Sequence, residues 1–343
     1  MRRWALTVDD VPEPVPQSGQ ALTRVLACGI CGSDLHLLQH GEESLALRDE
    51  LAAENPPGPL DPVPFEADQP TIMGHEFCCE VVELGPGCEN LAEGDIVVSM
   101  PAAFDAAGVH AIGFSNLYPG GYAERIVLND LLALKVPNGL EPRLAALTEP
   151  LAVGVHAVAK SGIRSDDAAI VLGCGPIGLA VIADLKQRGV SPVVAADLSP
   201  GRRALAERLG ADEVVDPAVE PAIAAWRRVD GTRPVVIFEA VGVPGMLDAC
   251  MRMAPKGTRI TVVGACLEAD TVRPIIGIGK ELSLQFVLGY EPHEFAAALM
   301  AIAEGKVDLE PMITGSVTVD GVPQAFADLG HPDAHAKILV EPA

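Results

Sequence analysis

A glycine-rich turn between an apolar run and a helical stretch is the feature that most constrains the fold of this chain. Residues 168–172 read AAIVL, Gly173, Gly175 and Gly178 follow in the pattern G-x-G-x-x-G, and LAVIADLKQRG comes next. The first glycine allows a tight turn, the second lets a pyrophosphate approach the backbone, and the third lets helix and strand pack closely. This context predicts a dinucleotide-binding α/β domain.

The pattern of the following residues supports that prediction. Further apolar runs alternate with longer helical stretches: PVVAADLS, RPVVIFEAVG, GTRITVVGA and ELSLQFVLG. Such alternation is typical of a doubly wound parallel sheet with helices on both faces. We place this domain at residues 150–290. The residues after it include an amphipathic stretch and a strand-like run, AHAKILVEP, so we expect 291–343 to return to the first domain.

The first 149 residues have the texture of β structure. Runs such as ALTRVLA, FCCEVVELG, DIVVSM and YAERIVL are separated by Gly, Pro and Asn, which predicts strands of a compact β domain. Between His36 and Gly74 lies a segment containing NPPGPLDPVPFEADQP. Proline lacks an amide donor, so we expect a long surface loop or an insertion there.

Composition excludes several kinds of partner. The 343 residues are enough for two domains with cores of their own, and 47 acidic against 24 basic residues give a net charge of −23. Such a surface repels phosphate backbones, so we expect no nucleic-acid partner. Neither a membrane-spanning run nor a signal peptide is evident. Eight irregularly spaced cysteines argue against a disulfide framework and favour a cytoplasmic protein.

The residues around the glycine-rich turn predict NAD as cofactor. Amides at the helix start face the pyrophosphate, and Asp197 ends the next apolar run, 19 residues beyond the last glycine. A carboxylate there would bind ribose hydroxyls and repel the extra phosphate of NADP. Arg202 and Arg203 follow and could soften this preference; the alternative is a plain glycine turn with Asp197 as a helix cap. The expected cofactor contacts are Gly173, Gly175, Pro176, Ile177, Gly178, Asp197 and Arg202.

Four residues of metal-ligand type predict one catalytic zinc site: Cys31, His75, Glu76 and Glu149. Zinc accepts thiolate, imidazole and carboxylate ligands, and a catalytic zinc keeps one position open. Neighbours on a regular strand point to opposite faces. His75 and Glu76 can therefore share a metal only if the backbone bends, which Gly74 permits. Otherwise Glu76 contacts a metal ligand and not the metal itself. Which of Glu76 and Glu149 touches the metal stays open.

Cys28 and Cys31 form a C-x-x-C pair that has two alternative explanations. A structural zinc ribbon needs a second such pair, and the sequence has none. A thiol redox pair is the other alternative. The nearby Ser33, Asp34 and His36 are suited to proton transfer, which a disulfide exchanger does not need. We therefore interpret Cys31 as a metal ligand and Cys28 as part of the strand packing.

Several motifs together carry a family resemblance. CGICGSDLH, GHEFCCEVVELG, EPLAVGVHAV, VLGCGPIGL and HAKILVEP resemble the medium-chain, zinc-dependent alcohol dehydrogenase superfamily, and the insertion before GHEF, with EPLAV, LEPMITG and KILV, is most similar to its butanediol and polyol (sorbitol) dehydrogenase branch. The resemblance implies a GroES-like β domain (1–149 with 291–343), a Rossmann domain, and an active site between them. It also implies a homodimer or homotetramer.

The resemblance also implies roles for single residues. Cys31, His75 and either Glu149 or Glu76 would bind the catalytic zinc. Ser33 would contact the alcohol hydroxyl, and His36 would pass its proton towards solvent, although His36 could also be an ordinary loop histidine.

One departure from the family concerns a second metal. Relatives commonly carry a lobe of four closely spaced cysteines that holds a structural zinc. This chain has no cysteine between Cys88 and Cys174, and PAAFDAAGVHAIGFSNLYPGGYAE stands in that region. We therefore expect one zinc per subunit.

The expected reaction is the reversible oxidation of a secondary alcohol or vicinal diol to a ketone, with hydride transfer to NAD. Zinc would lower the pKa of the substrate hydroxyl. Cys31, Ser33, His36 and Glu76 are the candidate catalytic residues. The alternatives are a zinc-free reductase similar to the quinone-reductase branch and a non-catalytic nucleotide-binding protein.

Overall fold

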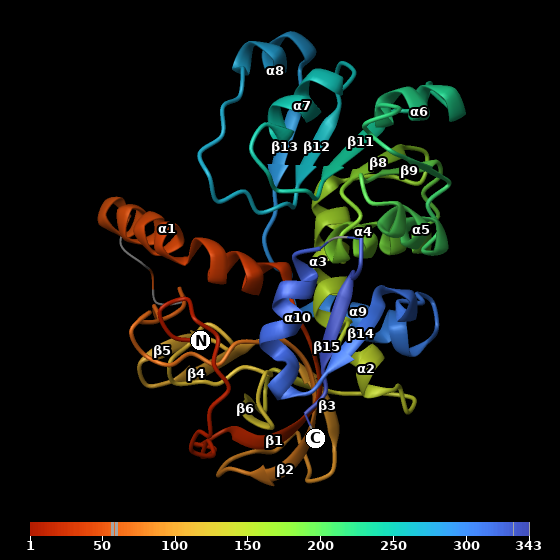
Figure 1. Cartoon of the computed structure of the whole chain (residues 1–343). Helices are drawn as coiled ribbons and strands as arrows, with labels where there is room; N and C mark the ends of the chain where they lie inside the picture. Colours follow the sequence, from red (N-terminus) through yellow and green to blue (C-terminus); the bar gives the residue numbers. More distant parts are fainter. Residues whose placement is uncertain (56–57, 59–60, 332, 343) are drawn as a thin grey trace. The chain divides into compact units, whose positions relative to one another are not determined.

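The computed structural model describes residues 1–55, 58, 61–331 and 333–342. The chain forms two compact units (Figure 1). The first comprises Met1–Glu149, Ile313–Gly330 and Lys337–Ala343, and the second comprises Pro150–Met312 and His331–Ala336. None of the described helices is both long enough and apolar enough to cross a lipid bilayer.

The second unit continues well beyond the expected boundary at residue 290. Helix α9 (Pro292–Ala303) belongs to it. On this helix Glu294 is buried, and its Oε2 lies 2.7 Å from Nδ1 of the buried His156 on α3 (Thr148–Ser161). Apolar side chains of α9, such as Phe295 and Leu299, are buried as well. The amphipathic pattern of this stretch is typical of a helix, but the pattern does not say which unit the helix packs against.

The first unit is built on a mostly antiparallel sheet. Its strand order is β14-β15-β1-β2-β3-β7, with β6 also paired to β1. The strands are β1 (Gln20–Gly29), β2 (Glu76–Leu84), β3 (Ile96–Ser99), β6 (Arg125–Asn129), β7 (Ala133–Lys135), β14 (Ile313–Val317) and β15 (Lys337–Val340), with a separate hairpin of β4 (Ala102–Asp105) and β5 (Gly108–Ala111). Alternate side chains of these strands, such as Val25, Phe77 and Ile126, form the core.

Helix α1 (Gly32–Glu54) replaces part of the loop that was expected after His36. The prediction was wrong for this stretch because residues 42–54 are rich in Glu, Leu and Ala, which are strong helix formers, and contain no proline. The helix is kinked at His40, where φ is −127° and ψ is 27°. In the expected insertion, residues 56, 57, 59 and 60 lie outside the described residues, and residues 61–75 contain no helix.

The second unit confirms the prediction of a doubly wound parallel sheet. Its strand order is β10-β9-β8-β11-β12-β13, and all neighbouring strands are parallel. The strands are β8 (Ala168–Leu172), β9 (Val193–Ala196), β10 (Glu213–Val215), β11 (Val235–Glu239), β12 (Arg259–Val262) and β13 (Ser283–Phe286). The helices that connect these strands are α4 (Pro176–Gln187), α5 (Pro200–Arg208), α6 (Ala222–Val229), α7 (Met246–Met253) and α8 (Pro274–Lys280).

Strands β8, β9, β11 and β12 are buried on both faces, which explains why they read as continuous apolar runs, whereas β13 at the edge of the sheet is exposed. In β11, Val235 and Ile237 belong to a core that includes Trp226 of α6 and Met251 of α7. The intervening Val236 and Phe238 point to the opposite face, and both are fully buried. Strand β10 was not predicted because its three residues are too few to show a period.

Candidate active site

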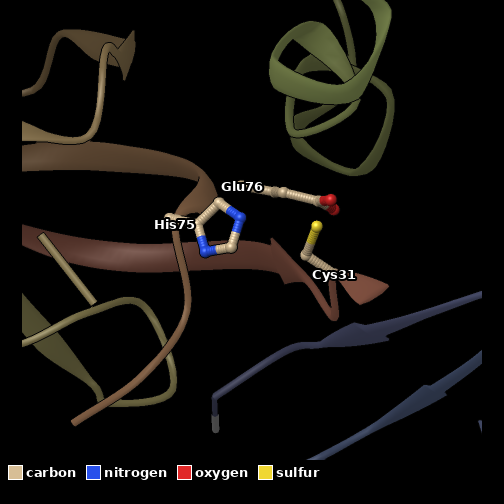
Figure 2. A group of neighbouring side chains, drawn as sticks. All are labelled: Cys31, His75 and Glu76. Atoms are coloured by element: carbon tan, nitrogen blue, oxygen red, sulfur yellow. The ribbon is translucent and has the colours of Figure 1, made fainter. Parts of the chain in front are cut away.

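Three of the predicted metal ligands come together in the first unit. The ligand atoms of Cys31, His75 and Glu76 all lie within 4.8 Å of one another. In Figure 2 the sulfur of Cys31 and the carboxylate of Glu76 point towards the same space, with the imidazole of His75 beside them. Cys31 comes from the turn between β1 and α1, whereas His75 and Glu76 lie at the start of β2.

A backbone bend before β2 resolves the geometric difficulty of two adjacent ligands. Gly74 has φ of +102°, a conformation that side-chain-bearing residues rarely adopt. A Cβ atom at this position would also lie 2.7 Å from the ring of Tyr122. Regular strand pairing starts only at Glu76, so His75 is free to turn towards the same space as its neighbour.

Asp34 connects two of these candidate ligands. Its Oδ2 accepts a hydrogen bond from the backbone amide of Cys31 at 3.1 Å, and its Oδ1 lies 3.4 Å from Nδ1 of His75. Burial alone would lower the pKa of His75, but the charges of Asp34 and Cys31 outweigh it and place that pKa well above its usual range. Asp34 itself is fully buried.

The donor set fits a zinc ion. A thiol, an imidazole and a carboxylate are the ligand types that zinc prefers, and all three converge here. His75 Nδ1 and Asp34 Oδ1 are buried and make no hydrogen bond of good geometry within the described structure. Buried polar atoms left in this way are costly. The two atoms lie 3.4 Å apart, so Nδ1 of His75 faces Asp34 and the other ring nitrogen, Nε2, is the one that would bind a metal ion.

Glu149 does not belong to the close group of three. It lies in the first turn of α3 and is largely buried, with 9% of its surface exposed. Its charge contributes to raising the pKa of Lys337, so it faces the same charged region of the first unit. Glu76 is therefore the glutamate that the structure places beside Cys31 and His75.

Lys337 is a site residue that the sequence reasoning missed. Its Nζ lies 2.6 Å from both carboxylate oxygens of Glu76 and 2.9 Å from the carbonyl oxygen of Ile30. Lys337 and Glu76 are both fully buried. Burial would lower the pKa of Lys337, but Glu76, Cys31 and Glu149 raise it. The sequence does contain a signal for Lys337, because it begins the apolar run KILV. A lysine in a buried strand needs a charged partner, since lysine is almost never fully buried without one.

The two residues expected to move a proton lie on α1. Ser33 is exposed, and its Oγ lies 3.4 Å from Nε2 of His75. His36 is half-buried one turn further along the same helix. Burial, and then the neighbouring His40, lower its pKa. Its imidazole is therefore neutral near neutral pH and able to accept a proton.

Cys28 shows none of the properties of a redox thiol. It is fully buried in β1, and burial, together with the charges of Glu76 and Asp34, raises the pKa of its thiol well above the usual range. Disulfide exchange needs an accessible thiolate. These features favour the interpretation of Cys28 as strand packing.

The glycine-rich turn of the second unit has the geometry that a dinucleotide site requires. Gly173 has φ of +88°, and a Cβ atom there would lie 2.7 Å from the carbonyl oxygen of Ala240. A Cβ atom at Gly178 would overlap the carbonyl oxygen of Gly173, so helix α4 packs directly on the turn. Gly175, Pro176 and Ile177 remain partly accessible. The turn therefore leaves the start of α4 open to a phosphate group.

Asp197 follows β9 and lies against this turn. Its Oδ2 accepts a hydrogen bond from the amide of Cys174 at 2.7 Å, and its Oδ1 accepts one from the amide of Ser199 at 2.8 Å. The carboxylate is thus held beside the glycine-rich turn by two backbone donors, in the place where a ribose-binding acid is expected.

The two arginines after Asp197 differ in their contacts. Arg203 donates from Nη1 to the carbonyl oxygens of Asp197 and Leu198, both at 2.7 Å. Arg202 has a buried Nε without a hydrogen-bond partner within the described structure, and its Nη1 lies 4.0 Å from where a Cβ of Gly175 would be. Of the two, Arg202 is the residue that reaches the glycine-rich turn.

The region that lacks the cysteine lobe is held by polar side chains. In the β4–β5 hairpin, Asp105 Oδ1 lies 2.9 Å from Nε2 of His110, and the hydroxyl of Tyr118 donates to Asp105 Oδ2 at 3.2 Å. Phe114 follows, with its ring 5.2 Å from the ring of His75. Among the residues that the structure describes, the only group of three or more clustered ligand-type side chains is that of Cys31, His75 and Glu76.

Comparisons with known proteins agree with this geometry. Residues 17–138 match the family model of the alcohol dehydrogenase GroES-like domain, and residues 176–304 match that of the zinc-binding dehydrogenases. (R,R)-butanediol dehydrogenase of Bacillus subtilis (strain 168) is 33% identical over 98% of this chain and 96% of the relative. Sorbitol dehydrogenase of Bos taurus is 27% identical over 94% and 89% of the two chains.

Solved structures show the same likeness over the whole length. A crystal structure of 2R,3R-butanediol dehydrogenase from Bacillus subtilis superposes with a TM-score of 0.83 at 31% identity, covering 99% of this chain and 97% of that one. A zinc-binding dehydrogenase from Sinorhizobium meliloti 1021, bound to NADP, superposes with a TM-score of 0.81 at 28% identity, covering 97% and 94%.

The fold and the site therefore define a dehydrogenase with a GroES-like domain and a Rossmann domain. The chain belongs to the medium-chain, zinc-dependent alcohol dehydrogenase superfamily, within its butanediol and polyol dehydrogenase branch. The resemblance inferred from the motifs is confirmed.

We predict that Lys337→Met destabilises the first unit by about 3–5 kcal/mol, because it leaves the Glu76 carboxylate buried without its cation. Denaturant unfolding should show this loss. The double variant Lys337→Met/Glu76→Gln should recover most of it, since neither charge then remains. Lys135→Met is a matched control: its Nζ lies 2.8 Å from Asp95 at an exposed site, and its loss should cost less than about 1 kcal/mol. Equal effects of the two single variants would contradict the prediction.

Proposed function

We propose that this enzyme catalyses the zinc-dependent, NAD-linked oxidation of a secondary alcohol or vicinal diol to the ketone, in a reversible reaction. The observation that carries the proposal is the convergence of Cys31, His75 and Glu76 in a chain whose other unit carries a dinucleotide turn. The relatives named for (R,R)-butanediol and sorbitol support the substrate class, because both compounds carry adjacent secondary hydroxyl groups.

Each part of the first unit has a role in this proposal. Zinc, when bound, would supply a Lewis acid, and NAD would supply the acceptor for the hydride. Cys31, His75 and Glu76 would hold the ion, with Glu149 as the further carboxylate candidate. Asp34 orients His75 through its imidazole nitrogen, as partners of metal-bound histidines generally do. Lys337 balances the negative charge of Glu76.

Ser33 and His36 form the proton path. The exposed hydroxyl of Ser33 is next to His75 and is placed to accept the proton of the substrate alcohol. His36, neutral near pH 7 because its pKa is lowered, receives that proton at a ring nitrogen and passes it to solvent. The pair is separated by three positions on α1, which places both side chains on one helix face.

We predict that a chelator abolishes NAD reduction by secondary alcohols and vicinal diols, and that added zinc restores it. Metal analysis should give one zinc per subunit, and Cys31→Ala should lose it. Cys266→Ala is the matched control, because Cys266 is exposed and lies in the other unit. The assay should cover primary, secondary, vicinal and cyclic alcohols, of which the secondary and vicinal ones are expected to react fastest.

The outcomes of this experiment separate the alternatives. Full reductase activity in zinc-free protein would support a zinc-free enzyme similar to the quinone reductases. Binding of NAD and zinc without turnover of any alcohol would support a non-catalytic nucleotide-binding protein. Two zinc ions per subunit would contradict the single-site prediction.

We predict that Ser33→Ala slows turnover by about 10²-fold at neutral pH while zinc content is unchanged, because the direct proton acceptor is lost. Steady-state kinetics across pH, together with metal analysis, would measure this. Ser44→Ala is the control on the same helix, where the hydroxyl donates only to the carbonyl oxygen of His40. Unchanged turnover in Ser33→Ala at every pH would refute the proton path.

We predict that NAD supports turnover at least about tenfold better than NADP at matched concentration, because the Asp197 carboxylate, held beside the glycine-rich turn, would repel the extra phosphate of NADP. Arg202 limits the preference for NAD, because its positively charged guanidinium reaches the same turn and would attract the extra phosphate of NADP. Kinetics with both cofactors test it, and equal or faster turnover with NADP would show that Arg202 outweighs Asp197.

A further inference from the structure

The segment from Gly113 to Tyr122 lies along the backbone that leads to His75. The amide of Gly120 donates to the carbonyl oxygen of Ile72 at 2.8 Å, and the amide of Tyr122 donates to that of Met73 at 2.9 Å. A Cβ atom at Gly120 would overlap the carbonyl oxygen of Gly74, so the two backbones touch. Tyr122 is thereby placed beside the bend that precedes the metal ligand.

The side chain of Tyr122 reaches further into the same site. Its hydroxyl donates to Asp34 Oδ2 at 2.6 Å, and the carbonyl oxygen of Gly29 lies 3.3 Å from it. The ring packs edge-on against Phe326 at 6.0 Å and is 7% exposed. Burial, and then the charge of Asp34, raise the pKa of Tyr122 well above its usual range, so the phenol keeps the proton that it donates.

Asp34 divides its two oxygens between the phenol and the imidazole. Oδ2 receives the hydroxyl of Tyr122 and the amide of Cys31, while Oδ1 lies 3.4 Å from Nδ1 of His75. Two donors on one oxygen stop the carboxylate from rotating, which keeps the other oxygen directed at the imidazole. The hydroxyl of Tyr122 therefore influences the orientation of the His75 imidazole through Asp34, without contacting the imidazole itself.

We propose that Tyr122 is a positioning residue of the zinc site: its hydroxyl holds Asp34, and Asp34 orients His75 for metal binding. The inference rests on the proposed zinc-dependent function. Partners that orient a metal ligand typically account for about 10- to 100-fold in metal affinity. Tyr122 acts on His75 only through Asp34, so we expect its effect on zinc affinity to lie at the lower end of that range.

The test is Tyr122→Phe, which removes the hydroxyl and keeps the ring. Zinc affinity would be measured by competition with a chromophoric chelator, and the ligand field by the visible spectrum of the Co(II)-substituted protein. We expect zinc to bind about tenfold more weakly and the Co(II) bands to shift. Neither readout needs substrate or NAD.

Tyr118→Phe is the matched control. Tyr118 is equally buried, at 8% exposure, and its hydroxyl donates to Asp105 instead of Asp34. It should lose thermal stability without any change in zinc affinity or Co(II) spectrum. Asp34→Asn provides a second variant: because both changes act through one contact, Tyr122→Phe should add little to it in a double-mutant cycle.

The outcomes are distinct. Wild-type zinc affinity and Co(II) spectrum in Tyr122→Phe would overturn the positioning role and leave the proposed function standing. Equal zinc loss in Tyr118→Phe would also overturn it, since general loosening of the domain would then be the cause. A wild-type protein that binds neither ion would overturn the zinc-dependent function and this role together.

Discussion

The buried ion pair between Lys337 and Glu76 is the interaction on which the metal site depends most. It joins residues 261 positions apart and lies where neither side chain touches solvent. Two charges withdrawn from water must satisfy each other, because the loss of one leaves the other at a cost of several kcal/mol. Strand β15 therefore does more than pair with β1. It also carries Lys337, whose positive charge allows the Glu76 carboxylate to be buried in the first unit.

Around that pair, the remaining side chains of the site are held by short contacts from several elements. Asp34 binds the amide of Cys31 and the hydroxyl of Tyr122, and Gly74 turns His75 towards the same space. The side chains of the site come from several elements. Their positions are set by the contacts between the start of α1, the start of β2 and the segment before β6.

Much of this could be predicted from the sequence because the decisive signals are local. The dinucleotide turn is a strand, a glycine pattern and a helix in one continuous stretch, so spacing alone specifies its geometry. The thiol of Cys31, the imidazole of His75 and the carboxylate of Glu76 favour zinc as the metal of the proposed site before any coordinates are known. Even the bend at Gly74 was foreseeable, since only glycine adopts that conformation without strain.

The parts that escaped prediction all depend on which distant segments meet. Nothing local to Lys337 says that β15 will lie opposite Glu76, and nothing local to Tyr122 says that its hydroxyl will reach Asp34. The length of α1 was missed because the prolines after residue 55 masked the good helix formers before it. The membership of α9 in the second unit depends likewise on a contact across 138 residues, between His156 and Glu294.

The segment between Gly113 and Gly120 has a consequence for how this enzyme can diversify. Both glycines lie so close to the backbone of Gly74 that a side chain at either position would displace it, and His75 with it. Phe114, between them, already rests against the ring of His75. A change at Phe114 would therefore alter the surface that faces His75, whereas the two glycine positions on either side stay closed to change.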